Sequence, residues 1–398
     1  MSKYPASSRV ALFSLAVAAL LVLPLIQPYT AAAQSGRKPA EKKAEKKTDV
    51  QKGAPPGQQG GEQEPPVAKN TPTIKLSTQV VGVDVTVIDK KSHRLITNLN
   101  KSNFTIYEDG VKQDITNFSP GDGPVTVVLL LDNGYQNHYF VNYYDPSMAQ
   151  EIFTSAAGFV QIFMKPGDYA GLVTFAMKPK VIQDFTDDRQ VLLGALQSAY
   201  NDLLNFHESN IYDALNFVLL GGKAVQLYDE KAGASQYLGL DELEGRSAVL
   251  LITTGIDTFS RITYDKAMKI VEGAGVPIFT IGVGNLFFKK YESRMSEDLR
   301  SSFLQADNAL NTFAKLSGGA YFPMTFEGEI PSIMKTIAAL LRSQYSLGYV
   351  PSNTRAEGKE RKIKVSVDVN GDGQPDDAKL DLRYREKYVE PGGNPKKK

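Results

Sequence analysis

The stretch that decides the fold of this 398-residue chain is Val127-Val128-Leu129-Leu130-Leu131-Asp132-Asn133. Its apolar part belongs to an expected strand over 125–131, and an apolar run of this kind is typical of a strand buried on both faces of a parallel sheet. Similar runs follow at 169–175, 247–253 and 277–283, at intervals long enough for helices. The sequence therefore predicts a doubly wound α/β domain with a mainly parallel sheet, whose ligands lie beyond the carboxyl ends of the strands.

Helices are expected between these strands, because apolar residues recur there about every 3.6 positions. The expected helices span 147–164, 188–200, 211–220, 264–274 and 309–316, and an edge strand is expected at 318–322. Together these elements place the α/β domain at 121–328.

A β-rich segment precedes this domain. Valine alternates with smaller or polar residues over 81–87, which is the period of a half-buried strand. Asp109-Gly110 is a strong two-residue turn signal between apolar runs at 104–107 and 111–115, so a hairpin is expected there. The sequence predicts a small β module at 73–120.

A second β segment follows the domain. A helix over 330–342 leads into strand-like runs at 344–350, 363–369 and 379–384, and we expect the last two runs to pair with each other across a Gly- and Asp-rich turn. This segment is assigned to 329–390.

The two ends of the chain have different compositions from the rest. Residues 1–33 have the layout of a secretory signal, with an early Lys and Arg, a short apolar run and Ala31-Ala32-Ala33. We expect cleavage after Ala33, with an uncleaved signal anchor as the alternative. Residues 34–72, rich in Lys, Glu, Pro and Gly, and the basic tail 391–398 are expected to be disordered. The expected location is secreted or periplasmic, with membrane contact only through the signal or linker.

Composition excludes several classes of function. The chain has no cysteine, which excludes disulfides, thiolate metal sites and cysteine nucleophiles. A net charge of +1, from 45 Lys plus Arg against 44 Asp plus Glu, argues against a nucleic-acid partner. The nucleophile elbow, the phosphate-binding loop and the zinc-protease motif are absent, so no enzyme activity is expected. A hydrolase site around His207 and Ser209 is the open alternative.

The segment around Asp132 resembles the first segment of a von Willebrand factor type A domain. In that family Asp-x-Ser-x-Ser, a later Thr and the Asp of Thr-Asp-Gly hold one divalent ion. Asp132 matches the first aspartate, and Gly134 and Gln136 stand where the two serines belong. Ser209 replaces the threonine, and Thr254 stands at the second aspartate. The resemblance implies that the frame of this metal site is kept while most of its ligands are not.

The replaced ligands determine what the resemblance implies for metal binding. Gly134 has no side-chain oxygen and Gln136 offers a neutral amide, so only Asp132 and Ser209 remain as metal ligands. Asp257 could replace the missing carboxylate, or it could act as an ordinary loop or helix-cap residue. No cofactor is expected, with Mg or Ca as the alternative.

The resemblance extends to the flanking β segments. Phe104 to Gln113, with its Tyr-Glu-Asp-Gly sequence, and Tyr345 to Pro351 resemble segments of a bacterial exported family called VWFA-related, of the acidobacterial type. Membership would imply binding or scaffolding, and little more.

A second candidate metal site lies near the C-terminus. Asp368, Asn370, Asp372 and Asp376 occupy positions 1, 3, 5 and 9 of a calcium loop. Its twelfth position, normally acidic, is Lys379. The alternative is a polar hairpin tip.

These observations lead to one main hypothesis: an exported, non-catalytic module that binds or scaffolds a protein or glycan of the cell envelope or extracellular space. Its ligand face is predicted to comprise Asp132, Gly134, Tyr135, Gln136, Tyr139, Ser209, Thr254 and Asp257. A metal-dependent adhesion module is the alternative.

Overall fold

The computed structural model describes residues 80–133, 146–201, 208–221, 237, 239–243, 245–326, 328–353, 355 and 358–390, with the backbone alone at 146–149 and 242. The predicted signal (1–33), linker (34–72) and tail (391–398) lie outside the described residues. So do His207 and four residues of the predicted ligand face: Gly134, Tyr135, Gln136 and Tyr139.

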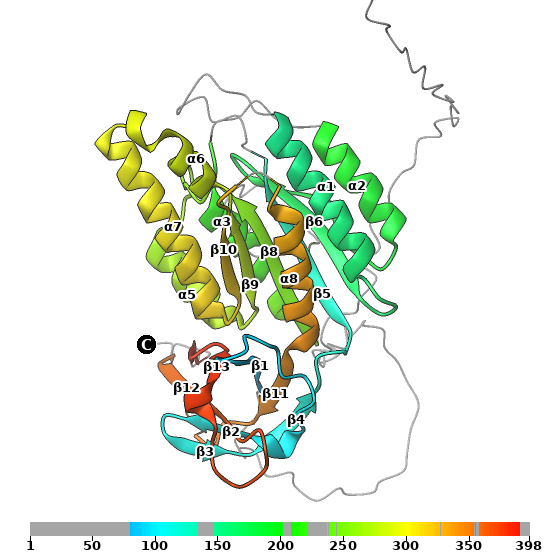
Figure 1. The fold of residues 1–398 in the computed structure, drawn as a ribbon, viewed down its shortest axis with the longest axis vertical. Coiled ribbons are helices and arrows are strands. Elements are labelled where there is room, and N and C mark those ends of the chain that lie inside the picture. Colours follow the sequence, from blue (N-terminus) through cyan, green and yellow to red (C-terminus); the bar gives the residue numbers. More distant parts are fainter. Residues whose placement is uncertain are drawn as a thin grey trace, which may run out of the picture. The chain divides into compact units, whose positions relative to one another are not determined.

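A six-stranded sheet forms the centre of the α/β domain (Figure 1). Its strands are β5 (Val125–Asp132), β6 (Tyr169–Phe175), β7 (Pro179–Thr186), β8 (Arg246–Thr253), β9 (Ile278–Gly282) and β10 (Ala320–Pro323). Their order is β10-β9-β8-β5-β6-β7, and every neighbouring pair is parallel except β6 and β7. The predicted doubly wound, mainly parallel sheet is confirmed. The chain leaves β5 toward one edge and returns to β8 on its other side, so the switch point lies at the carboxyl ends of these two strands.

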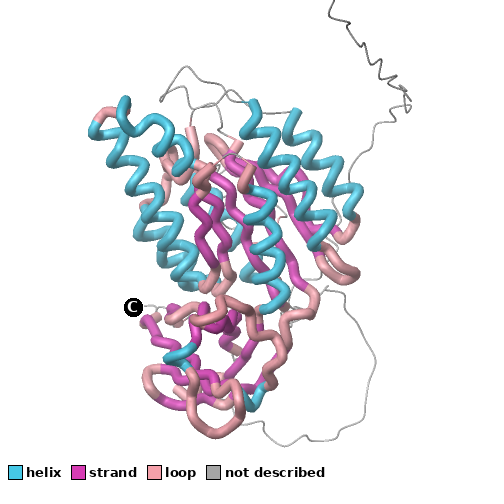
Figure 2. The backbone as a smooth tube through the Cα atoms, viewed as in Figure 1, coloured by secondary structure: helices cyan, strands magenta, loops and turns pink. Residues whose placement is uncertain are grey.

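Helices cover both faces of this sheet (Figures 1 and 2). The helices are α1 (Pro146–Phe163), α2 (Arg189–Asn201), α3 (Ile211–Leu220), α5 (Tyr264–Ala274), α6 (Gly284–Tyr291), α7 (Glu297–Ser317) and α8 (Ile330–Ser343). Leu129 and Leu131 pack with α1, α2 and α8 in one core, and Val128 and Leu130 pack with α3, α5 and α7 in the other. Burial on both faces explains why this strand is apolar without alternation.

Three elements differ from the sequence prediction. The α7 helix begins at Glu297, well before the expected start at 309, and the side chain of Ser296 caps it by accepting from the backbone N–H of Leu299. Strand β7 and helix α6 were not expected. The first half of α7 is polar, so apolar periodicity did not reveal it.

The flanking segments fold together into one β unit. The strands before the α/β domain are β1 (Val81–Asp89), β2 (Phe104–Glu108), β3 (Val111–Gln113) and β4 (Ile115–Ser119); those after it are β11 (Tyr345–Tyr349), β12 (Glu360–Val367), β13 (Leu380–Arg383) and β14 (Lys387–Val389). They form two four-stranded sheets, of order β13-β1-β11-β4 and β14-β12-β2-β3. Their inward side chains, such as Val85, Ile106, Tyr345 and Val365, share one core. The β2–β3 hairpin around Asp109-Gly110 is confirmed.

The expected pairing between 363–369 and 379–384 is wrong. Strand β12 pairs with β2 and β14, while β13 pairs with β1. Near the end of β12, Asp377 takes the place of a partner strand, because its carboxylate accepts from the backbone N–H of Val367 (2.9 Å) and the hydroxyl of Ser366 (2.8 Å).

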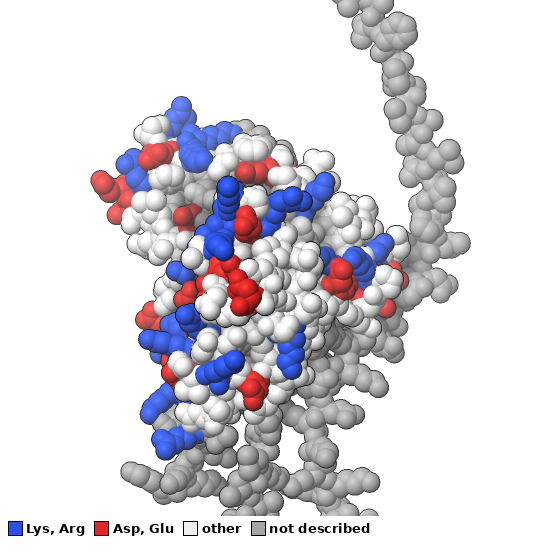
Figure 3. Space-filling model, turned by 60° about the horizontal axis from the view of Figure 1, so that its bottom comes forward, with Lys and Arg blue, Asp and Glu red and all other residues white. Residues whose placement is uncertain are grey.

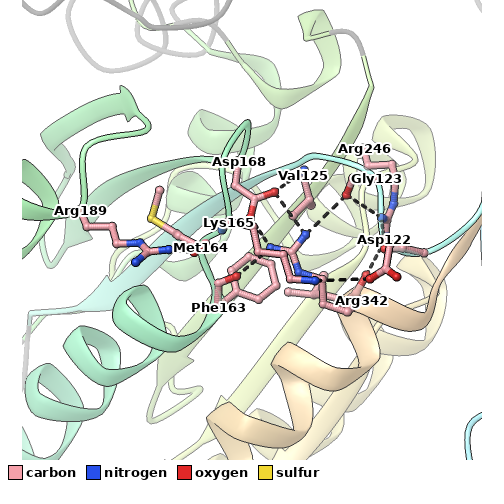
Figure 4. Close-up of polar contacts among 12 residues, drawn as sticks. Asp122, Gly123, Val125, Phe163, Met164, Lys165, Asp168, Arg189, Arg246 and Arg342 are labelled. Carbon is pink, nitrogen blue, oxygen red and sulfur yellow. Dashed lines mark hydrogen bonds and ion pairs between the residues drawn. The ribbon is translucent and has the colours of Figure 1, made fainter.

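Two arginines, Arg246 buried and Arg342 partly buried, fix the points where the chain passes between the β unit and the α/β domain (Figure 4). Arg246, the first residue of β8, donates to the carbonyls of Gly121 (2.6 Å) and Gly123 (3.2 Å). Arg342, near the end of α8, binds the carboxylate of Asp168 and donates to the carbonyl of Phe163 (2.7 Å). The incoming loop and the outgoing helix are therefore both held by charge-assisted hydrogen bonds.

Charged side chains of both signs are scattered over the face shown in Figure 3, which agrees with a net charge near zero. Among the helices that the structure describes, none combines the length and apolarity needed to cross a membrane.

Candidate functional site

The candidate site lies at the edge where the parallel strands end, here called the top face. Strands β5 and β8 are neighbours in parallel register, with Leu131 opposite Ile252, so their last residues meet. Asp132 is 4% exposed, and its Oδ2 accepts hydrogen bonds from the hydroxyls of Thr253 (2.6 Å) and Ser209 (3.2 Å). Topology thus brings together three residues that lie far apart in the sequence.

The loop after β8 fixes Ser209 in this position. The backbone N–H of Ser209 donates to the hydroxyl of Thr258 (2.8 Å), and the N–H groups of Thr258 (2.8 Å) and Phe259 (3.1 Å) donate to the carbonyl of Ser209. Ser209 immediately precedes Asn210, the N-cap residue of α3. The top-face loops are therefore bonded to one another.

Three buried oxygens beside this cluster have no hydrogen-bond partner among the described residues. They are the side-chain oxygens of Asn133, Asn210 and Thr254, and each follows Asp132, Ser209 or Thr253 directly in the sequence. The backbone N–H groups of Asn133 and Asn210 donate to the carbonyls of Phe175 and Ala176, which places both asparagines against the end of β6. Buried acceptors of this kind are usually satisfied by water or by a bound group.

The Asp257 carboxylate bonds within its own loop and to the first turn of α3. It accepts from the hydroxyl of Ser260 (2.5 Å) and from the backbone N–H of Tyr212 (3.5 Å). Burial raises the pKa of the Asp257 carboxyl, and burial together with this carboxylate raises the pKa of Tyr212 to about 12. The sequence left two roles open for Asp257, a metal ligand or an ordinary loop or helix-cap residue. These contacts are of the second kind.

Of the predicted ligand face, Asp132, Ser209 and Thr254 lie at the top face, and Asp257 lies in the loop after β8. Sequence reasoning missed Thr253, whose hydroxyl donates to Asp132 at 2.6 Å. A signal was present, since Thr253 stands at the first position of the Thr-Asp-Gly pattern.

The candidate calcium loop is held by its own backbone. The two carboxylate oxygens of Asp368 accept from the N–H groups of Gly371 and Gly373, each at 2.8 Å. The ammonium group of Lys379 donates to Asp376 at 2.7 Å and lowers the pKa of that carboxyl. The twelfth position therefore supplies a cation where a calcium loop has an acid.

The side-chain oxygens of Asn370 and Asp372 accept hydrogen bonds from within the loop. The amide of Asn370 donates to a carboxylate oxygen of Asp372 (2.9 Å). Within the part of the chain that the structure describes, no group of three or more Asp, Glu or His side chains is arranged to hold a metal ion.

Comparison with known families identifies the domain. Residues 146–316 match the model of the von Willebrand factor type A domain. This part of the chain is a von Willebrand factor type A domain. The match begins after β5, yet β5 is an inner strand of the A-type domain's sheet, so the Asp132 cluster belongs to the same fold.

Several solved structures share a likeness with the chain. Proximal thread matrix protein 1 from the mussel byssus is 16% identical, with 55% of this chain and 48% of that chain covered and a TM-score of 0.38. An aerotolerance-related membrane protein from Bacteroides fragilis is 17% identical (55% and 98% covered, TM-score 0.36). The vWF domain of the type V pili tip protein Mfa5 from Porphyromonas gingivalis is 14% identical (54% and 94% covered, TM-score 0.36).

The chain spans about half the length of the mussel protein. No curated protein matches the chain.

Proposed function

We propose that this chain is a non-catalytic binding module, exported from the cytoplasm, that takes a protein partner on the top face of its A-type domain. The observation that carries this proposal is that the buried Asp132 cluster and several exposed apolar side chains lie at the same edge of the sheet. The predicted partner class was a protein or a glycan, and the apolar side chains favour a protein.

Two exposed apolar residues are bonded directly to the segment that holds Ser209. Met177 is 40% exposed, and its carbonyl accepts from the side-chain amide of Asn210 at 2.8 Å. Phe259 is 48% exposed, and its N–H donates to the carbonyl of Ser209. Phe326, 58% exposed, follows the end of β10 at the same edge of the sheet. Large apolar side chains held in place beside a ligand edge are typical of protein interfaces.

The polar chemistry of the site favours binding without a metal. Divalent ions require enough negative charge to offset the loss of their water, and here Thr254 replaces a carboxylate with a neutral hydroxyl. The Asp132 carboxylate already accepts hydrogen bonds from Thr253 and Ser209. A partner can therefore be recognised through donors and apolar anchors alone.

A metal-dependent adhesion module is the second candidate. The observation that favours it is the set of side-chain oxygens on Asn133, Asn210 and Thr254 that have no hydrogen-bond partner among the described residues. Oxygen atoms are the ligands that Mg²⁺ and Ca²⁺ prefer. Asp132 and Ser209 would hold the ion.

A hydrolase is the weakest candidate. The Ser209 hydroxyl donates its hydrogen bond to Asp132, and its backbone groups bond to the loop after β8, which is an arrangement that fixes structure. If a turnover screen found activity, Ser209→Ala should abolish it.

The binding test starts from a partner captured from an envelope or extracellular fraction and then purified. Substituting Met177→Ser together with Phe259→Ser should weaken its binding at least about tenfold, as expected for central apolar anchors. The matched control replaces two apolar residues on helices that are even more exposed, Ile162 (74%) and Leu304 (57%). Ile162→Ser together with Leu304→Ser should leave the affinity unchanged. Equal losses in both variants would contradict the proposal.

Metal dependence is tested by calorimetric titration of Mg²⁺ and Ca²⁺ into the wild type, Asp132→Ala and Asp372→Ala. Absence of heat with both ions, together with partner binding that survives a chelator, is the expected result. Heat lost only in Asp132→Ala would support the adhesion module. Heat lost only in Asp372→Ala would place calcium in the loop at 368–379.

A further inference from the structure

The β unit carries a second surface that the A-type domain does not explain. Residues of β2 alternate between the shared core, which takes Phe104, Ile106 and Glu108, and the outer side of the sheet, which takes Thr105 and Tyr107. Because side chains alternate along a strand, the residues paired with Thr105 and Tyr107 on the neighbouring strands also face outward.

Strand register places a basic row on this outer side. Tyr107 pairs with Lys112 of β3 on one side and with Lys364 of β12 on the other, so the three residues lie in line across three strands. Lys362 lies two positions along β12 from Lys364 and shares its face. Strands in a sheet are about 4.8 Å apart, which keeps the Cα atoms of these lysines within about 10 Å of the Cα atom of Tyr107. We call Tyr107, Lys112, Lys362 and Lys364 the basic sheet face.

The charges of this face are not compensated. Lys112, Lys362 and Lys364 are exposed, and none of their side chains forms an ion pair with another described residue. By contrast Lys387, opposite Lys362 on β14, is paired with Glu272 and Glu360, each at 3.0 Å. Three uncompensated lysines on one sheet face stand out in a chain whose net charge is +1.

A hollow of about 490 Å³ adjoins this face. Lys112 and Thr105 belong both to the outer side of the sheet and to the wall of the hollow. The wall also includes the polar residues Asn100, Lys101, Ser102, Gln113 and Asp114 and the apolar residues Phe104 and Ile115. The wall therefore contains two lysines and one carboxylate, that of Asp114, together with several neutral hydrogen-bonding side chains. A group that enters the hollow from the row meets positive charge and donors.

We propose that the basic sheet face and this hollow bind an acidic polysaccharide. The face is elongated across three strands, which fits a chain of repeating anionic units better than a single ion. The ring of Tyr107 offers an apolar surface with a polar tip between two lysines, which suits a sugar ring that carries carboxylates. The hollow accommodates a sugar unit, whereas a flat membrane surface would leave it unfilled.

The test uses the full chain with polygalacturonate as the acidic probe and dextran as the neutral one. Polygalacturonate should bind, more weakly as salt rises from about 50 to about 200 mM, and dextran should not. Substituting Lys112→Gln with Lys364→Gln should weaken binding about tenfold, while Lys112→Arg with Lys364→Arg should retain it. Failure of polygalacturonate to bind, or equal binding of dextran, would overturn the proposal.

A matched control separates this face from general charge. Lys266→Gln with Lys269→Gln removes the same charge from exposed positions on α5 and should leave affinity within about twofold. An equal loss in this control would overturn the proposal. So would single-stranded DNA or phosphatidylglycerol vesicles that bind as tightly as polygalacturonate. Asp132→Ala should leave this binding unchanged, which keeps the outcome separate from that of the top-face proposal.

Discussion

At the residue scale, Asp132 and Glu108 show how similar buried carboxylates take different roles. Asp132 lies at the end of β5 and accepts from two hydroxyls, and the oxygens beside it have no partner in the part of the chain that the structure describes. Glu108, of the Tyr-Glu-Asp-Gly motif, lies inside the β unit and accepts from the hydroxyls of Tyr349 (2.8 Å) and Tyr388 (2.9 Å). The glutamate of this motif therefore has a structural role, because it joins strands from both flanking segments.

The bond between Thr253 and Asp132 should contribute measurably to stability. Thr253→Val is expected to lower the free energy of unfolding by about 2 kcal/mol, because a buried hydrogen bond to a charged group is lost. The control, Thr280→Val, removes a buried neutral bond to the carbonyl of Leu310 (3.3 Å) and should cost about 1 kcal/mol or less. Urea unfolding measures both, and equal costs would contradict the structural role of Asp132.

At the element scale, the ends of α5 and α7 lie against the strand connection at Tyr384 and Arg385. Both helices end at a glycine in the left-handed region, Gly275 (φ 65°) and Gly318 (φ 79°). A Cβ at Gly318 would lie 2.7 Å from the backbone nitrogen of Arg385, and one at Gly275 would meet the Arg385 guanidinium. These glycines serve both the helix cap and the close approach of the β unit.

Gly318→Ala should therefore cost more than an ordinary left-handed glycine. Gly328 has the same kind of φ (84°) but open space around its Cβ position, so Gly328→Ala should cost only about 1 kcal/mol of conformational strain. Gly318→Ala adds a clash with backbone and should cost about 1 to 3 kcal/mol more. Denaturant midpoints of the two variants compare these costs directly, and similar midpoints would contradict close packing at this junction.

At the scale of the whole molecule, the β unit depends on chain segments that lie on both sides of the A-type domain. Strand β1 lies between β11 and β13, and β2 lies between β12 and β3. The A-type domain is thus inserted within the β unit, and the arginines at 246 and 342 bind the loop and the helix that connect them.

Truncation tests this interdependence. A chain that ends after 343 lacks β11 to β14, so residues 81–119 lose most of their core partners and should become sensitive to protease. A chain that ends after 390 keeps every described strand and should resist protease as the full chain does. Protection of 81–119 in the shorter chain would show that the first segment folds alone.

Buried tyrosines should set the alkaline limit of stability. Burial raises the pKa of Tyr212 to about 12, and burial together with Glu108 raises the pKa of Tyr349 and Tyr388. Below about pH 10 these groups are neutral in the folded and unfolded states alike. Above it the unfolded chain loses protons that the folded chain retains, so stability should fall as pH rises from about 10 toward 12. Melting temperatures measured as pH rises, together with the absorbance of tyrosinate, test this expectation. A melting temperature that stays constant through about pH 11 would refute it.

The amino-acid sequence alone was enough to predict a doubly wound α/β fold and the edge of its sheet where a ligand would lie, and the resemblance around Asp132 predicted the A-type domain. Apolar runs such as 125–131 are long enough to specify buried parallel strands, and the order of strands and helices then leaves few topologies. The place of Asp132 at this edge could also be predicted, because it is the last residue of a central strand. The β2–β3 hairpin could also be predicted from local sequence, since Asp109-Gly110 determines its turn.

Which distant segments lie side by side is visible only in the folded structure. Local patterns state that 363–369 is a strand, but its partners β2 and β14 are chosen by the shared core and by the Asp377 contacts at its end. The bond from Thr253 to Asp132 and the row from Lys112 to Lys364 arise in the same way, from register between strands far apart in the chain. Periodicity records which face of a strand is buried and carries no information about its neighbour, so these sites emerge only when the sheets are assembled.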